Sequence, residues 1–384
     1  MRIAVVGGGP GGLYFASLWK RRHPTAVIEL FEQNPADATW GFGVVFSAQA
    51  LEFLREDDPD TVDAIAPRMQ SWSNITLSLR GEKIEIDGIG FASIGRLELL
   101  QILQQRARAE GVVCHFDSQI QTLDQVSGYD LVVAADGLNS LIRRSFEDHF
   151  GTSLAYATNK FAWYGTTKRF ETLSQTFVET ELGSFNAHHY RYASTMSTFL
   201  VECDSATWER CGFAGKSIDQ SRDICERVFA KALDGHALIS NKSVWRSFPW
   251  LWNERWWFRN MVLIGDALHT AHFSIGSGTR LAIEDAIALV KALEREPDDL
   301  GAALAAYEAT RKPVVQKLVA AARASGDWYE QFPAHMRLDP FDFALGYITR
   351  SGRIDPARLR AMSPEFMARY ERAKGATARR EGQS

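Results

Sequence analysis

The feature that most constrains this chain is a glycine-rich turn near its N-terminus, directly after a short apolar segment. The segment Ile3-Ala4-Val5-Val6 predicts a buried parallel strand. Gly7, Gly9 and Gly12 follow at the spacing G-x-G-x-x-G and open an expected helix through Leu13 to Lys20. Glycines permit a tight turn and a close approach of the backbone, so that a pyrophosphate can lie at the helix N-terminus. The pattern therefore predicts a dinucleotide-binding domain.

An acidic residue stands where such a domain needs one. A second strand, expected at Val27–Phe31, ends at Glu32, which lies 20 residues beyond Gly12. At this spacing a carboxylate accepts hydrogen bonds from a ribose. The turn, the strand and the spacing together favour nucleotide binding over a simple surface carboxylate.

Two further motifs follow expected buried strands later in the chain. The strand at 130–135 leads into Asp136-Gly137, with Ser140 and Arg143 completing the pattern D-G-x-x-S-x-x-R. The strand at 261–264 leads into Gly265-Asp266-Ala267 and then into a turn that ends at Gly276 and Gly278. Each motif alone is ordinary loop chemistry, so it is their order and separation that are informative.

Together the three motifs resemble those that contact FAD in the single-component flavin hydroxylases, the aromatic-hydroxylase family related to para-hydroxybenzoate hydroxylase. The resemblance implies FAD as cofactor and NADH or NADPH as a transient co-substrate, because no second G-x-G-x-x-G follows a later strand. Arg96, at the start of an expected helix, matches a family arginine that touches the cofactor phosphates. The expected FAD-binding residues are Gly7, Gly9, Pro10, Gly11, Gly12, Glu32, Gln33, Val45, Arg96, Asp136, Gly137, Gly265, Asp266, Gly276, Ser277, Gly278 and Thr279.

The chain departs from the family pattern close to the expected flavin. Phe273 replaces the usual proline and Arg280 replaces the usual asparagine. No arginine stands between Arg22 and Arg55, where the family commonly places one on the phosphates. These changes alter the wall beside the flavin, so ring motion and substrate fit are expected to differ from the family pattern.

Composition sets limits on the partners. The 384 residues carry a formal net charge of −4, which gives no reason to expect nucleic acid or an anionic membrane as a partner. No stretch approaches the length of a transmembrane span. The four cysteines show no metal-ligand spacing, so we expect no metal site and a reduced, cytoplasmic compartment. The oligomeric state is not predicted.

The predicted fold class is α/β, with a Rossmann-type FAD-binding domain, an antiparallel-sheet substrate domain and C-terminal helices. Four strands rich in aromatic and β-branched residues, expected between 161 and 202, indicate the antiparallel sheet. The predicted divisions are a discontinuous FAD-binding domain at 1–72, 96–158 and 250–300, a substrate-binding sheet at 73–95 and 159–249, C-terminal helices at 301–371, and a disordered tail at 372–384.

Several longer segments resemble one branch of the family, the branch that contains salicylyl-CoA 5-hydroxylases. These segments include Ala187–Tyr192, Met196–Phe199 and His272–Gly276. The resemblance implies hydroxylation of an aromatic CoA thioester with NAD(P)H and O2, with salicylyl-CoA to 2,5-dihydroxybenzoyl-CoA as the leading reaction. The open alternatives are 2-aminobenzoyl-CoA or an indolic natural product as substrate, and a noncatalytic flavin-binding carrier. A flavin halogenase is disfavoured because no W-x-W-x-I-P motif occurs.

The candidate catalytic residues are His188, Tyr190 and His272. Side chains alternate along a strand, so His188 and Tyr190 share one face, while His189 and Arg191 share the other. A histidine close to a phenol can accept its proton or stabilise its phenolate near neutral pH. His188 is favoured, His272 inside the third motif is its main rival, and a packed sheet histidine is the alternative for His188.

Overall fold

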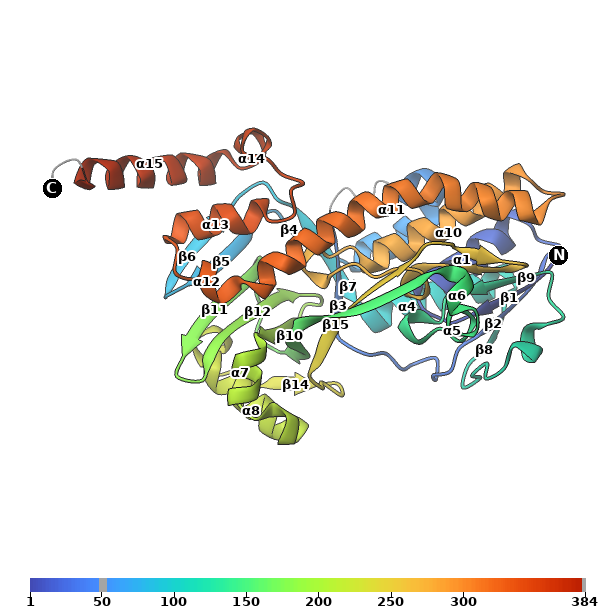
Figure 1. Cartoon of the computed structure of the whole chain (residues 1–384), viewed down its shortest axis with the longest axis horizontal. Coiled ribbons are helices and arrows are strands. Elements are labelled where there is room, and N and C mark those ends of the chain that lie inside the picture. The colour runs from blue at the N-terminus through green and yellow to red at the C-terminus, as the bar shows by residue number, and fades with distance from the viewer. Residues whose placement is uncertain (48–53, 382–384) are drawn as a thin grey trace.

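The computed structural model describes residues 1–47 and 54–381. Its first layer is a six-stranded sheet in the order β16-β17-β9-β1-β2-β8 (Figure 1). Four neighbouring pairs of this sheet are parallel, and only the edge pair β16–β17 is antiparallel. The strands are β1 (Arg2–Val6), β2 (Val27–Phe31), β8 (Val113–His115), β9 (Leu131–Ala134), β16 (Trp257–Phe258) and β17 (Met261–Leu263).

The chain leaves β1 toward β2 on one side and returns to β9 on the other. This reversal of strand order creates a crevice at the carboxyl ends of β1 and β9, the place where open α/β sheets bind ligands. Helices pack on the sheet and close its core. They are α1 (Pro10–Arg22), α3 (Pro59–Ile65), α4 (Arg96–Glu110), α5 (Leu141–Ser145), α6 (Glu147–Phe150) and α10 (Gly278–Arg295).

A second, eight-stranded sheet forms the other half of the molecule. Its path is β14-β10-β13-β12-β11-β5-β6, with β15 paired to β10. All its pairs are antiparallel except β5 with β11, which run parallel. The strands are β5 (Ile75–Leu79), β6 (Glu82–Ile86), β10 (Thr152–Thr166), β11 (Leu173–Thr180), β12 (Gly183–Arg191), β13 (Ser197–Cys203), β14 (Leu238–Ser240) and β15 (Arg246–Asn253). Its outer face is covered by α7 (Ser205–Arg210), α8 (Ile218–Val228) and α9 (Ala230–Leu233).

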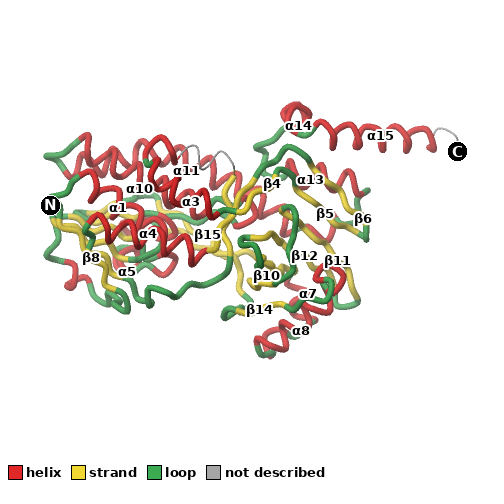
Figure 2. Tube along the Cα trace, turned by 180° about the vertical axis from the view of Figure 1, so that it is seen from behind, coloured by secondary structure: helices red, strands yellow, loops and turns green. Residues whose placement is uncertain are grey.

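The C-terminal helices join the two halves. Helix α11 (Leu300–Glu330) runs through Pro313 without interruption and lies along the length of the body in Figures 1 and 2. Its first half contributes Leu304 and Tyr307 to the core of the parallel sheet, whereas Tyr329 belongs to the core beneath β5 and β6. The remaining helices are α12 (Phe332–His335), α13 (Pro340–Thr349), α14 (Pro356–Met362) and α15 (Pro364–Glu381).

Three of the sequence-based divisions differ from the structure. The expected boundary at 158 falls inside β10, because Thr152 to Tyr156 already pair with β15 and make one long ribbon. The segment 91–95 is β7, which pairs with β3 (Gly43–Ser47) and β4 (Gln70–Trp72) in a separate three-stranded sheet. The expected disordered tail is helical through Glu381, because its alanine, arginine, lysine and glutamate residues are strong helix formers. Residues 382–384 lie outside the described part.

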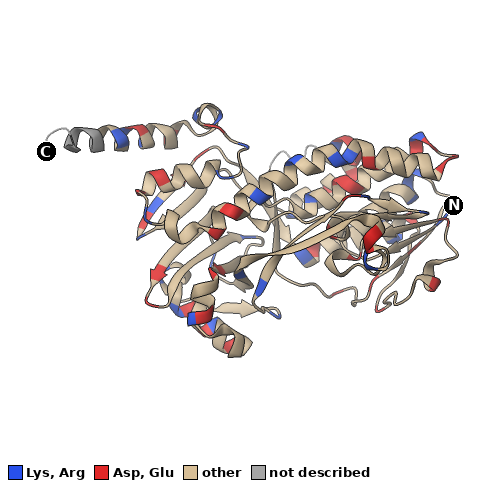
Figure 3. Ribbon diagram, in the orientation of Figure 1, with Lys and Arg blue, Asp and Glu red and all other residues tan. Residues whose placement is uncertain are grey.

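The surface carries both signs of charge, and acidic and basic residues are interspersed along the ribbon in Figure 3. Among the described helices, none is both long enough and apolar enough to cross a membrane.

Candidate active site

The turn after β1 has the geometry of a phosphate cradle. Gly7 has a φ of 108°, and a Cβ at this position would lie 2.3 Å from the carbonyl oxygen of Ala135. Its N–H donates to the carbonyl of Phe31 at 2.8 Å, which ties the turn to β2. Gly9 is the N-cap of α1 and has no side chain to cap it, and apart from its chain neighbours a Cβ there would meet no atom of the described residues within 4 Å. Space therefore opens where the backbone N–H groups of the helix N-terminus are available for an anion.

Glu32 stands at the end of β2, as predicted, and its side chain is held in place. One carboxylate oxygen accepts the N–H of Gly8 at 2.7 Å, and the other accepts the N–H of Asn34 at 2.9 Å. The carboxylate is thus fixed next to the glycine turn. Its hydrogen bond to a ribose stays a prediction.

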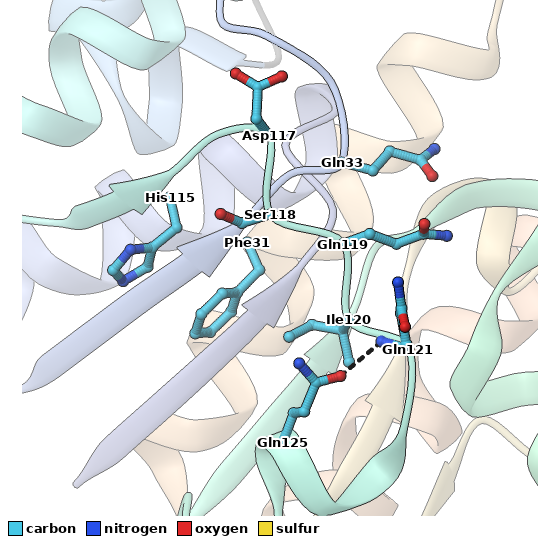
Figure 4. A pocket seen from close by; sticks show the side chains of 9 residues that line it. All are labelled: Phe31, Gln33, His115, Asp117, Ser118, Gln119, Ile120, Gln121 and Gln125. Carbon is cyan, nitrogen blue, oxygen red and sulfur yellow. Dashed lines mark hydrogen bonds between the residues drawn. The ribbon is translucent and has the colours of Figure 1, made fainter.

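A cavity of about 800 Å³ opens beside Glu32, at the carboxyl ends of β2 and β8. Figure 4 shows the amide side chains of Gln33 and Gln119 on one side of this cavity and the rings of Phe31 and His115 on the other. Gln33 is exposed, so it is available to a ligand. The cavity adjoins the end of the crevice where the nucleotide half of a dinucleotide would lie.

The second motif is physically joined to the third. Asp136 accepts the N–H of Leu141 through Oδ2 at 2.8 Å, whereas its buried Oδ1 has no partner among the described residues. Burial raises the pKa of Asp136. The guanidinium of Arg143 donates to the carbonyl of Ala267 at 3.3 Å, which links the loop after β9 to the loop after β17. A buried carboxylate oxygen normally accepts a hydrogen bond, so Oδ1 of Asp136 is a position where a bound ligand could supply the donor.

Asp266 and Arg96 lie within electrostatic range of each other. The Asp266 side chain is exposed. Partial desolvation by the protein around it raises the pKa of its carboxyl, while the charges of His269 and Arg96 oppose that rise. Desolvation likewise lowers the pKa of Arg96, and Asp266 opposes the fall. Val45 of β3 lies beside Gly276, since a Cβ on that glycine would meet the Val45 side chain at 3.5 Å. Residues predicted from four separate segments therefore lie along one crevice.

His188 and Tyr190 lie on the same face of β12, as their spacing predicts. The ring of His188 packs against Phe273 of the third motif, with centroids 5.3 Å apart. The Tyr190 hydroxyl donates to the carbonyl of Gly43 at 2.9 Å, at the start of β3. His189 points the other way and stacks on Phe199 in the core of the second sheet, with centroids 5.0 Å apart. The face that carries His188 is thus the one turned toward the third motif.

Both ring nitrogens of His188 are engaged by protein side chains. Nδ1 lies 2.9 Å from Nε2 of Gln175, and Nε2 lies 3.4 Å from Oε2 of Glu202. The other oxygen of Glu202 accepts from Asn159 at 2.9 Å. Burial, together with the charge of Arg350, lowers the pKa of His188 to about 3, and burial raises the pKa of Glu202. Sequence reasoning missed Glu202, because a single glutamate in an apolar strand carries no motif.

His272 of the third motif packs in an aromatic cluster with side chains of β15 in the second sheet. Its ring stacks on Trp250, with centroids 5.5 Å apart, and lies edge-on to Phe248 at 4.7 Å. Nδ1 lies 2.8 Å from Oγ of Ser274, whereas within the described residues no side chain bonds to Nε2. The side chain is only 3% exposed, and burial lowers its pKa to about 3. Of the two candidate histidines, His272 is the one with an unengaged nitrogen.

The chain matches known proteins in agreement with this geometry. The model of the FAD binding domain family matches residues 1–322. Salicyloyl-CoA 5-hydroxylase of a Streptomyces species is 39% identical over 361 residues, which cover 91% of this chain and 70% of that protein. A 3-hydroxy-4-methyl-anthranilyl-[aryl-carrier protein] 5-monooxygenase of Streptosporangium sibiricum is 35% identical and covers 87% of this chain and 90% of that protein. The crystal structure of a 2-methyl-3-hydroxypyridine-5-carboxylic acid oxygenase mutant has the same fold, with a TM-score of 0.71 at 18% identity, covering 94% of this chain and 96% of that one.

The Rossmann sheet, the second sheet roofing its crevice and the three joined motifs define an FAD-dependent aromatic monooxygenase. The chain belongs to the FAD-binding-domain family of flavin monooxygenases. The predicted fold class, cofactor and enzyme class are therefore confirmed. The residues present fit FAD, because the glycine cradle is open and Asp136 holds a buried oxygen without a partner among the described residues.

Proposed function

We propose that this enzyme hydroxylates an aromatic ring carried on a CoA thioester, most specifically salicylyl-CoA to 2,5-dihydroxybenzoyl-CoA. The two relatives support this substrate class, since both names give an aromatic acyl group on a carrier and oxygenation at ring position 5. The observation that carries the proposal is the aromatic cluster that His272 and Phe273 of the third motif form with His188 of β12.

The ring of the substrate would lie between β12 and the loop that follows β17. When bound, FAD supplies the activation of O2 after reduction by NADH or NADPH. The protein's part is to hold the ring and exclude water. Phe248, Trp250 and Phe273 give an apolar wall, and an apolar wall favours burial of an aromatic ring and keeps water from the reaction. Asp266 and Arg96 would hold the cofactor's sugar-phosphate chain.

His188, Tyr190 and His272 are the proposed substrate-facing residues. Tyr190 is tied to β3 through Gly43, and His188 is tied to Gln175 and Glu202. A ring nitrogen without a protein partner is available to exchange a hydrogen bond with an oxygen of the substrate. The contacts thus favour His272 over His188 as the residue that meets the substrate. Comparison of His188→Ala with His272→Ala tests this assignment, with product formed per NAD(P)H consumed as the measurement. We expect the larger loss of coupling in His272→Ala.

A substrate screen tests the proposed function as a whole. Purified protein loaded with FAD is mixed with NADH or NADPH and with salicylyl-CoA, 2-aminobenzoyl-CoA or free salicylate, and NAD(P)H oxidation and hydroxylated product are measured. We expect salicylyl-CoA to give the highest kcat/KM and free salicylate the lowest. Equal efficiency with free salicylate contradicts the thioester, and a preference for 2-aminobenzoyl-CoA or an indolic compound moves the assignment to those substrates.

We also propose a cytoplasmic location, because CoA thioesters and reduced nicotinamides are both available in the cytoplasm. Its four cysteines are unpaired, and Cys203, Cys211 and Cys225 are buried. Free buried thiols fit a reducing compartment. Fractionation of cells that express the protein, with a periplasmic marker as control, tests the placement.

A further inference from the structure

A chain of hydrogen bonds connects the C-terminal helices to His272. Arg350, the C-cap of α13, donates from Nε to Oγ of Ser325 on α11 at 2.9 Å. Ser325 Oγ lies 2.7 Å from Oγ of Ser274, which in turn lies 2.8 Å from Nδ1 of His272. These hydrogen bonds connect residues that lie up to 78 positions apart in the sequence (272 to 350).

Arginine fixes the direction of this chain. A guanidinium has five N–H donors and no acceptor, so Ser325 must accept from Arg350. The single proton of Ser325 is then available for Ser274, and the proton of Ser274 for Nδ1 of His272. The backbone N–H of Ser274 also points at Nδ1 from 3.4 Å. A proton on Nδ1 would face this N–H, so Nδ1 is an acceptor and the ring proton resides on Nε2.

Two further contacts hold the Arg350 side chain in this position. Its Nη2 donates to the carbonyl of Ser274 at 2.8 Å, and its guanidinium lies over the ring of Tyr347 at 4.0 Å. Ser325 is completely buried and Ser274 is half-buried. The backbone N–H of Ser274 favours this protonation pattern, because the opposite one would turn a proton on Nδ1 of His272 toward that N–H.

We propose that His272 acts as a hydrogen-bond donor to an oxygen of the aromatic substrate through Nε2–H, and that Arg350 is the positioning residue that sets this state. The inference rests on the proposed function for the identity of the substrate. The role differs from that of a general base, because His272 has no free lone pair to accept a proton. A donated hydrogen bond favours the charged form of a phenol, so the Nε2–H group would stabilise the phenolate that directs attack on the ring.

The charges around His272 agree with a neutral donor. Glu202 of β13 raises the pKa of His272, whereas Arg350 of the C-terminal helices and a proton on His188 of β12 lower it. Burial is the largest influence, and it keeps the imidazole neutral through the working pH range.

Nitrogen NMR of the holoenzyme tests the chain without any substrate. In protein labelled with ¹⁵N-histidine, each ring tautomer gives its own pattern of long-range proton couplings, and the His272→Gln spectrum assigns the His272 signals. We expect the Nε2–H pattern in the wild type and a mixed pattern in Ser274→Ala and Arg350→Met. Arg323→Met is the matched control, because Arg323 also stacks on an aromatic ring, that of Trp250 at 4.5 Å, yet makes no bond in the chain. An Nδ1–H pattern in the wild type overturns the proposal.

Measurements of kcat distinguish a hydrogen-bond donor at position 272 from a general base. Glutamine keeps an N–H donor but cannot accept the proton, whereas leucine keeps neither function. We expect His272→Gln to retain kcat within about 10-fold of the wild type and His272→Leu to lose about 10²-fold or more, as removal of an oxyanion donor does. Equal losses in both folded variants overturn the donor role. If the wild type hydroxylates no aryl thioester, the proposed function and the donor role fall together, and the NMR pattern still decides the Arg350 chain.

Discussion

Asp285 accepts the backbone N–H of Gly265 at 3.1 Å and thereby fastens the loop after β17 to helix α10. The same carboxylate lies 2.9 Å from Nε2 of His269 and accepts from Nε of Arg311 at 2.8 Å. Burial raises the pKa of Asp285, but His269 and Arg311 outweigh it and bring the pKa to about 2. A fully buried, paired carboxylate thus holds the turn that presents Asp266.

We expect Asp285→Ala to destabilise the protein by about 1–3 kcal/mol, because the buried Nε–H of Arg311 loses its acceptor, while Glu284 still pairs with the Arg311 charge at 2.9 Å. FAD retention should fall with it, since Gly265 loses its anchor. Urea unfolding and the flavin-to-protein absorbance ratio measure the two effects. Glu294→Gln is the control, because Glu294 lies on the same helix and pairs with Arg22 at 3.0 Å in a partly exposed setting. Such a pair contributes about 0–1 kcal/mol, so an equal loss in both variants contradicts the prediction.

The glycine turn offers a matched pair of substitutions. Gly7→Ala should destabilise even the FAD-free protein by about 1–3 kcal/mol or more, since φ is 108° and the new Cβ would collide with Ala135. The Cβ of Gly9→Ala meets no atom of residues 1–47 and 54–381 within 4 Å, its chain neighbours aside, and φ is an ordinary −71°, so the FAD-free protein should be as stable as the wild type. Its FAD affinity should nevertheless fall at least 10-fold, because the methyl group occupies the pyrophosphate's space.

Urea unfolding of FAD-free protein and flavin fluorescence titration separate the two glycine variants. Unchanged FAD affinity in Gly9→Ala would show that the cofactor takes another path.

Arg96 and Asp266 give a pH-dependent prediction for cofactor binding. The charge of Arg96 lowers the pKa of Asp266 against the effect of desolvation, so Arg96→Met lets that pKa rise further. The Asp266 carboxylate of the variant then takes up a proton at a higher pH than in the wild type. We expect FAD affinity to be weaker in Arg96→Met, and the deficit to grow as the pH falls from 8 to 6. Flavin fluorescence titrations at both values measure it, and Arg96→Lys, which keeps the charge, should restore most of the pH dependence of the wild type.

The arrangement of the candidate FAD-binding residues was predictable from the sequence, because they follow strands in short, local motifs. Gly7, Asp136 and Asp266 each stand at the carboxyl end of a strand that an apolar segment marks. Parallel strands bring those ends to one edge, so the motifs meet without any further information. The alternation along β12 likewise gave the correct faces for His188 and Tyr190.

The polar network around the substrate space was not accessible in that way. Glu202, Gln175 and Arg350 come from different elements, and their relation to the two histidines depends on the register of β11 with β12 and on the path of the C-terminal helices. Neither follows from local spacing. The boundary at 158 was missed for a similar reason, since the pairing of Thr152 with Asn253 is a contact between distant segments.

Three buried histidines contribute to how stability depends on pH. Burial lowers the pKa of His188, His189 and His272 from 6.5 to about 3 in each case. The unfolded chain therefore binds more protons than the folded one between pH 6.5 and about 3, and stability falls as the pH decreases through this window. Glu202 works in the opposite direction, because burial raises its pKa.

The substitution His189→Gln tests how much one of these histidines contributes to the pH dependence of the unfolding free energy. His189 packs away from the substrate face and bonds through Nε2 to Thr176 at 2.8 Å, a contact that glutamine can replace. We expect His189→Gln to reduce the slope of unfolding free energy against pH by up to about 1.4 kcal/mol per pH unit below pH 6.5. Urea unfolding at pH 7, 6 and 5 measures the slope in both proteins. A variant slope equal to that of the wild type would mean that His189 is protonated in the folded state and would contradict the prediction.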